Sequence, residues 1–171
     1  MTAGKSKHDL RRLLCRKSVL LACVGTELRS DDRAGLEFYR TLKKIKPDAP
    51  AIECEFGLEN CLDEILRLMP ETLIVVDAVL PEGGGAEGGD VILAPADSAV
   101  MTSVPASTHN IPLPTILKFL QSSGCCRETY ILGVVAKDLS VGEDATPEVL
   151  NAVKALAEAV ADALNACGEP S

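Results

Sequence analysis

The stretch VLLACVGTELRSDDRAG, at residues 19–35, decides the fold of this chain. Its apolar first half is typical of a buried strand that ends at Gly25, and a helical pattern of apolar residues begins just after Asp31 and Asp32. A strand that passes through a polar turn into a helix is the repeating unit of parallel α/β sheets. Such a turn lies at the carboxyl edge of the sheet, where α/β proteins bind their ligands.

The same alternation of strand and helix patterns continues along the whole chain. We expect strands near 19–25, 51–56, 72–79, 90–93 and 129–135, and helices near 32–45, 59–68, 112–122 and 147–167. Strands that alternate with helices favour right-handed crossovers and a parallel sheet. The predicted fold class is therefore α/β, a three-layer sandwich with a mostly parallel twisted sheet of about five strands and helices on both faces.

The ends and the loops define the expected domain organisation. Residues 1–17 carry six Lys or Arg and a single Asp, which predicts a basic, flexible leader that is solvated ahead of the first strand. Residues 18–168 then form a single α/β domain, and the glycine-rich segment at 81–89 is a loop within it.

Composition argues against two classes of partner. The net charge is -8 and aromatic residues make up 3% of the chain, so neither a basic phosphate-binding surface nor a base-stacking platform is expected. The apolar run at 19–24 leads directly into charged residues without a signal-peptide cleavage site. No apolar stretch approaches the roughly 18–20 residues that span a bilayer. We expect a cytoplasmic protein that does not bind nucleic acid or insert into a membrane.

The seven cysteines do not form a recognisable metal or disulfide pattern. Their number is odd, no C-x-x-C pair occurs, and Cys23 and Cys54 lie inside apolar strand patterns. Cys125 and Cys126 are adjacent, and adjacent cysteines seldom form a bridge. We therefore expect reduced thiols in a reducing compartment.

Three side chains with metal-binding chemistry are predicted at the carboxyl edge of the sheet. Asp32 follows the first strand, Asp77 lies near the end of TLIVVDAV at 72–79, and His109 closes a long polar loop after the strand near 90–93. Two carboxylates and one imidazole suit a divalent transition metal. Three protein ligands would leave coordination positions open for water or a substrate.

Each of these residues also has a purely structural explanation. Asp32 alone would be a helix cap, although Asp31 is the better candidate for that role. A single loop histidine such as His109 is most often simply exposed. Asp77 is harder to explain in this way, because an acid that closes so apolar a strand is costly without a partner. Their coincidence at one edge favours the metal site.

Other catalytic templates fit less well. The sequence contains no G-x-G-x-x-G after the first strand, no phosphate-binding G-x-x-x-x-G-K-[ST], no G-x-S-x-G and no H-E-x-x-H. A Cys/His nucleophile pair stays open as an alternative, but none of the cysteines sits in a convincing electropositive setting.

Several motifs together resemble a known family. VLLACVGTELRSDDRAG is followed by FGLEN at 56–60, IVVDAV at 74–79, STHNIPLP at 107–114 and YILGVV at 130–135. Over residues 18–165 this order resembles the maturation endopeptidases of nickel-iron hydrogenases, in particular the branch that serves the hydrogenase-3-type large subunit.

The resemblance implies a specific reaction. Members of this family remove a short C-terminal peptide from the hydrogenase large-subunit precursor after nickel has been inserted. Their metal-contacting, catalytic positions correspond by motif to Asp32, Asp77 and His109 of this sequence. The implied cofactor is nickel that the precursor itself carries, with other divalent metals as possible substitutes in the isolated protein. Lewis-acid polarisation or a metal-bound water are the physical options for cleavage.

The sequence departs from the family pattern in two places. Thr26 follows Gly25 where the family usually has Asn, and Gly-Val-Val-Ala at 133–136 stands where it usually has Gly-Ile-Gln-Pro. These changes leave the proposed ligands intact but indicate a divergent member. Two other functions therefore stay open, a non-catalytic metal-checking or chaperone-like binder and a hydrolase or phosphorylase of small molecules.

Overall fold

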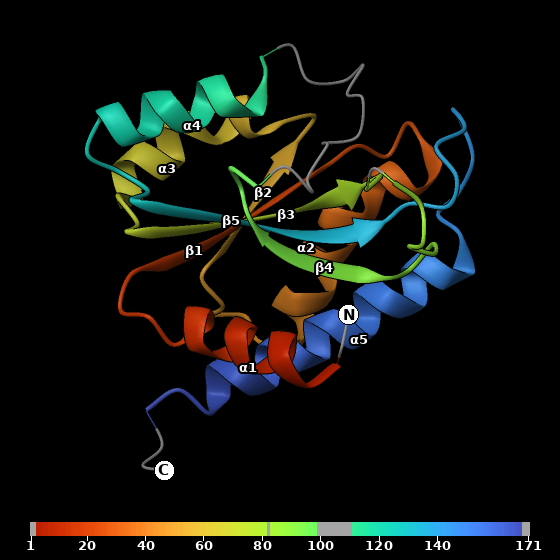
Figure 1. Ribbon diagram of the computed structural model, residues 1–171, viewed down its shortest axis with the longest axis horizontal. Helices are drawn as coiled ribbons and strands as arrows, with labels where there is room; N and C mark the ends of the chain where they lie inside the picture. The colour runs from red at the N-terminus through yellow and green to blue at the C-terminus, as the bar shows by residue number, and fades with distance from the viewer. Residues whose placement is uncertain (1–2, 82, 99–110, 169–171) are drawn as a thin grey trace.

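The computed structural model describes residues 3–81, 83–98 and 111–168, with side chains from residue 7 onward (Figure 1). Its strands are β1 (Val19–Gly25), β2 (Ala51–Glu55), β3 (Thr72–Val79), β4 (Val91–Pro95) and β5 (Glu128–Val135). Its helices are α1 (Ala3–Leu14), α2 (Ala34–Ile45), α3 (Leu62–Leu68), α4 (Leu113–Ser122) and α5 (Pro147–Asn165), and two short 3-10 turns are η1 (Ser30–Arg33) and η2 (Leu58–Cys61). Within this described part, none of the helices combines the length and the hydrophobicity that crossing a membrane requires.

The strands form one five-stranded sheet in the order β2-β1-β3-β5-β4. Strands β2, β1, β3 and β5 are parallel to one another, and β4 runs antiparallel to β5 at the edge. All eight residues of β3 pair with β5, which places the nearly continuous apolar run of β3 at the centre of the sheet. The predicted α/β fold with a mostly parallel sheet of about five strands is confirmed.

Helices cover both faces of the sheet (Figure 1). On one face α1, α2 and α5 pack through a core that includes Leu14, Leu21, Phe38, Ile74, Leu132 and Val160. On the other face η2, α3 and α4 pack through a core that includes Val24, Ile65, Leu73, Ile116 and Leu120. The sheet thus supports helices from both sides and leaves its carboxyl edge to the loops.

Helix α1 corrects the prediction of a solvated leader. Leu10, Leu13 and Leu14 are only 8%, 3% and 2% exposed, and α1 packs beside α5 (Figure 1). The spacing of these leucines gives one apolar face of a helix, and the dense basic charge around them masked it in the sequence. Just beyond α1, the Arg16 guanidinium donates to the Thr72 hydroxyl at 3.2 Å and pairs with Glu128.

The cysteines correct a second prediction. Disulfides join Cys15 to Cys167 and Cys54 to Cys61, so the expectation of seven reduced thiols is wrong for four of them. Cys15 follows α1 and Cys167 follows α5, and only the fold brings these distant positions together. Among the described residues, Cys23, Cys125 and Cys126 are the free thiols, and all three are buried.

Candidate active site

Two glycines bring the turn after β1 onto the edge of the sheet. A Cβ atom on Gly35 would lie 2.0 Å from the carbonyl oxygen of Val24 and 2.6 Å from that of Val76. A Cβ atom on Gly25 would lie 2.5 Å from the carbonyl oxygen of Asp32. Helix α2 therefore begins in direct contact with the ends of β1 and β3, because glycine allows a backbone approach that other residues would block.

Asp32 occupies the turn that these glycines position. It lies in η1 and is 3% exposed. Its backbone N–H donates to the carbonyl of Arg29 at 2.9 Å, and its own carbonyl accepts from the N–H of Thr26 at 3.0 Å. The backbone of Asp32 is thus fixed at the carboxyl end of β1.

Asp77 lies in the central strand near the same edge. In β3 it comes directly after Val76, which is level with Cys23 of β1, and it is level with Gly133 of β5. Its side chain is half-buried, and Oδ1 accepts a hydrogen bond from the N–H of Ala78 at 2.8 Å. Asp77 is two residues from the end of β3, so it belongs to the same sheet edge as Asp32.

The third predicted ligand, His109, lies outside the described residues. Within residues 3–81, 83–98 and 111–168, no group of three or more His, Cys, Asp or Glu residues is arranged to hold a metal ion. The structure therefore brings two of the three predicted residues to one edge, and the complete three-residue metal site stays a prediction.

Asp31 has a different partner from the one expected. The sequence predicts it as the cap of the helix that follows, but neither η1 nor α2 has a side-chain cap. Its carboxylate instead accepts hydrogen bonds from the N–H groups of Lys137 (2.8 Å), Asp138 (2.9 Å) and Thr146 (2.7 Å). The cap prediction for Asp31 is wrong because the loop at 136–146 folds back over the turn and supplies these donors.

Further contacts join the same two loops. The Asp31 N–H donates to the carbonyl of Asp138 at 3.0 Å, and the Ser30 hydroxyl donates to the carbonyl of Asp144 at 2.9 Å. The Arg33 guanidinium reaches the carbonyl of Glu143 at 3.1 Å. No local sequence pattern links these segments, so sequence reasoning missed the loop at 136–146 as a support of the site.

Thr26 shows how the chain accommodates its first departure from the family pattern. Its hydroxyl accepts a hydrogen bond from the N–H of Leu28 at 3.2 Å, and the residue is 1% exposed. Thr26 is not among the described residues with positive φ, so the turn does not require the left-handed conformation that Asn tolerates. The hydroxyl stabilises the turn locally.

The free thiols are poorly suited to nucleophilic catalysis. Cys23 is completely buried in β1, and burial raises the pKa of its thiol far above the usual range. Burial and the neighbouring Cys125 likewise raise the pKa of Cys126. Because the thiolate is the reactive form, these two cysteines do not support the alternative of a Cys/His nucleophile pair.

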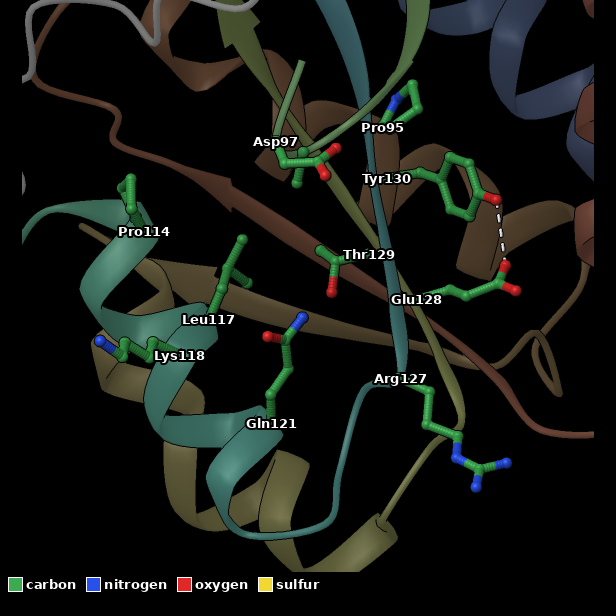
Figure 2. Close-up of a pocket in the computed structure, with 11 residues that line it drawn as sticks. Pro95, Asp97, Pro114, Leu117, Lys118, Gln121, Arg127, Glu128, Thr129 and Tyr130 are labelled. Atoms are coloured by element: carbon green, nitrogen blue, oxygen red, sulfur yellow. Dashed lines mark hydrogen bonds between the residues drawn. The ribbon is translucent and has the colours of Figure 1, made fainter.

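A cavity of about 560 Å³ lies away from Asp32 and Asp77, between α4 and the start of β5. Leu117 and Gln121 of α4 and Thr129 of β5 project toward one another there (Figure 2). Thr129 is level with Leu73 near the start of β3, whereas Asp77 lies near the end of that strand. The cavity is therefore at the opposite edge of the sheet and does not belong to the predicted site.

Known structures share this fold. The crystal structure of the [NiFe] hydrogenase maturation protease HycI from Thermococcus kodakarensis KOD1 matches with a TM-score of 0.74 and 21% identity, covering 92% of this chain and 99% of that one. The hydrogenase maturating endopeptidase HybD from E. coli matches with a TM-score of 0.67 and 20% identity, covering 88% and 94%. The endopeptidase HycI from Escherichia coli matches with a TM-score of 0.67 and 25% identity, covering 85% and 90%.

Sequence comparisons give one partial relative and one family. The chain is 31% identical over 98 residues to the cytochrome P450 monooxygenase fsdH of Fusarium heterosporum, a match that covers 54% of this chain and 16% of that protein. The family model described as HycI, hydrogenase maturation protease, matches residues 57–163. Because this match spans more than half of the chain, the protein belongs to the HycI family of hydrogenase maturation proteases.

Proposed function

We propose that this protein is an endopeptidase that removes the C-terminal peptide from the nickel-loaded large-subunit precursor of a nickel-iron hydrogenase. The observation that supports this most directly is the position of Asp32 and Asp77 at one sheet edge in a chain of the hydrogenase maturation protease family. We expect the two proteins to meet in the cytoplasm.

In this proposal Asp32, Asp77 and His109 contact the nickel that the precursor carries. Two carboxylates and one imidazole are suitable ligands for such a metal. Since nickel belongs to the substrate, the remaining coordination positions are filled by the precursor. A precursor without nickel cannot make these contacts through the metal. The protein would therefore act only on a precursor into which nickel has been inserted.

The structure suggests why Asp32 is suited to this role. Its turn is connected to the loop at 136–146 through Ser30, Asp31 and Arg33, and it rests on the end of β1 through Gly25. A ligand held on such a rigid support loses little conformational freedom when it contacts the metal.

The test uses purified precursor with and without nickel. We expect the protein to shorten the nickel-loaded form by its C-terminal peptide, detected by intact mass, and to leave the nickel-free form uncut. Asp77→Asn and His109→Ala are expected to slow cleavage by more than about 100-fold, since even outer-shell partners of metal ligands contribute about 10–100-fold. Asp162→Asn and His8→Ala serve as matched controls, because Asp162 lies exposed near the end of α5 and His8 lies exposed on α1.

The outcomes separate the alternatives. Tight binding of the nickel-loaded precursor without cleavage would favour the non-catalytic metal-checking binder. If the protein neither binds nor cleaves any hydrogenase precursor, both proposals are rejected. If Asp77→Asn or His109→Ala cleaves the precursor as fast as the wild type, the protease function stands and the assigned site is rejected.

A further inference from the structure

Large apolar side chains are exposed at the same sheet edge as the candidate site, including Leu80 directly after β3. Leu28 follows β1, Phe56 follows β2 and Val141 follows β5, and they are 60%, 41% and 78% exposed. We call Leu28, Phe56 and Val141 the apolar rim. Single exposed apolar residues are common on protein surfaces, but a group of them at one sheet edge is typical of an interaction site.

The backbone holds all three rim residues beside the end of β1. Leu28 accepts a hydrogen bond through its carbonyl from the N–H of Gly142 at 2.9 Å, and Arg29 and Val141 form an isolated antiparallel bridge. Phe56 donates its N–H to the carbonyl of Gly25 at 2.8 Å. The rim therefore adjoins the turn that carries Asp32.

Phe56 is held in a conformation that its residue type disfavours. Its φ of 70° lies in the left-handed region, where a bulky side chain is rare. Such strain costs stability and is concentrated at sites where a particular side-chain position is required for function. Phe56 stays 41% exposed despite this backbone cost.

The loops that present the rim are negatively charged. Residues 26–33, 56–60 and 136–144 contain seven Asp or Glu and three Lys or Arg. Asp31 and Asp32 are buried, so five of these acids and the three cations remain for the surface. Among them Glu27 pairs with Arg40, Asp144 with Arg33 and Lys137 with Glu148. The surface around the rim is therefore complementary to a positively charged partner.

We propose that the apolar rim is the docking surface for the precursor polypeptide next to the bond that is cut, and that it takes apolar side chains of a segment flanked by basic residues. This inference rests on the proposed function. The occupant follows from position and charge, because a protease must hold its substrate chain beside the reacting bond and the rim frames the edge that carries Asp32 and Asp77. An apolar centre within a charged border is also the usual composition of a protein–protein contact.

The test replaces apolar rim atoms with polar atoms of similar shape. Leu28→Asn and Val141→Thr keep the size of the side chains, and Leu68→Asn is the matched control. Leu68 is 50% exposed at the end of α3, which leads into the start of β3 at the opposite edge of the sheet. Steady-state cleavage of nickel-loaded precursor is measured for each variant at low and high salt, after thermal melts establish that it is folded.

We expect each rim variant to raise KM about tenfold, which corresponds to about 1.4 kcal/mol, with little change in kcat. Leu68→Asn should leave both constants unchanged. Higher salt should raise the KM of the wild type, because it screens the attraction between the acidic loops and the basic segment. If Leu28→Asn fails to fold, Val141→Thr decides the result alone.

Two failures are distinguishable. If the wild type cleaves the precursor and the rim variants have unchanged KM, the docking surface is rejected and the protease function stands. If the wild type neither binds nor cleaves a nickel-loaded precursor, both the proposed function and the docking surface are rejected.

Discussion

The carboxylate of Asp31 accepts hydrogen bonds from both the backbone N–H and the hydroxyl of Thr146, at 2.7 Å and 3.0 Å, across 115 residues of sequence. Asp31 is 0% exposed, and the N–H groups of Lys137 and Asp138 complete its set of donors. A buried carboxylate is stable when donors surround it, because they replace the water that it lost. This contact joins the turn that carries Asp32 to the start of α5.

We predict that Asp31→Asn lowers the free energy of unfolding by about 3 kcal/mol. The Asn side chain would place an NH2 group where Asp31 has an acceptor oxygen. This group would face backbone N–H donors of the loop at 136–146 and leave them without an acceptor. Urea denaturation of the variant measures the change, and Asp144→Asn is the control because its side chain is 99% exposed. A midpoint within error of the wild type would show that Asp31 does not anchor the loop.

The strands and most helices were predictable because their patterns are local. The β-branched run at 72–79 became β3, and the periodic apolar positions after Pro147 became α5. The position of Asp32 and Asp77 at one edge was also predictable, since it follows from where parallel strands end.

What the sequence did not reveal depends on contacts between distant segments. Asp31 and Asp32 are neighbours with the same chemistry, and only the returning loop at 136–146 shows that Asp31 accepts hydrogen bonds from Lys137 and Thr146. The leucines of α1 were masked by basic residues, and the pairing of Cys15 with Cys167 requires that α1 and α5 lie side by side. No local pattern encodes these long-range contacts.

We predict that Gly35→Ala destabilises the protein by about 3 kcal/mol, at the upper end of the cost of overpacking. The new Cβ atom would lie 2.0 Å and 2.6 Å from two main-chain carbonyl oxygens, which cannot move without displacing β1 or β3. Gly84→Ala is the control. Its new Cβ atom would have open space around it, so the substitution costs only the left-handed backbone strain of about 1–2 kcal/mol. Equal destabilisation of the two variants in chemical denaturation would contradict the close approach of α2 to the sheet.

We predict that reduction of the Cys15–Cys167 disulfide lowers stability more than reduction of Cys54–Cys61. The bonded cysteines are separated by 152 residues in the first case and 7 in the second. In the chain-entropy model, closing these loops contributes about 5 and about 2 kcal/mol. Thermal melts of Cys15→Ser and Cys61→Ser measure the difference, and mass spectrometry after thiol alkylation checks the pairing. A larger loss in Cys61→Ser would contradict this order.

We predict that Glu128 makes stability depend on pH in the acid range. The hydrogen bond and the charge of Arg16 hold the pKa of Glu128 below its ordinary value of 4.5. The stabilisation is therefore complete above pH 4.5 and is lost as the pH falls through the lowered pKa of the folded state. Melting temperatures of the wild type and Glu128→Gln should converge as the pH falls below this range. A difference that stays constant with pH would exclude the ion pair as its source.

We predict that Phe56→Asn stabilises the protein by about 0.5–1 kcal/mol while it weakens precursor binding. Asn tolerates the left-handed backbone that Phe56 adopts at a φ of 70°, so the substitution relieves strain. It also removes the aromatic ring of the apolar rim, which should raise KM for the nickel-loaded precursor. Urea denaturation and steady-state cleavage of the same variant measure the two effects. If Phe56→Asn lowers stability, the ring is retained for its packing and the strained backbone is not a feature of precursor docking.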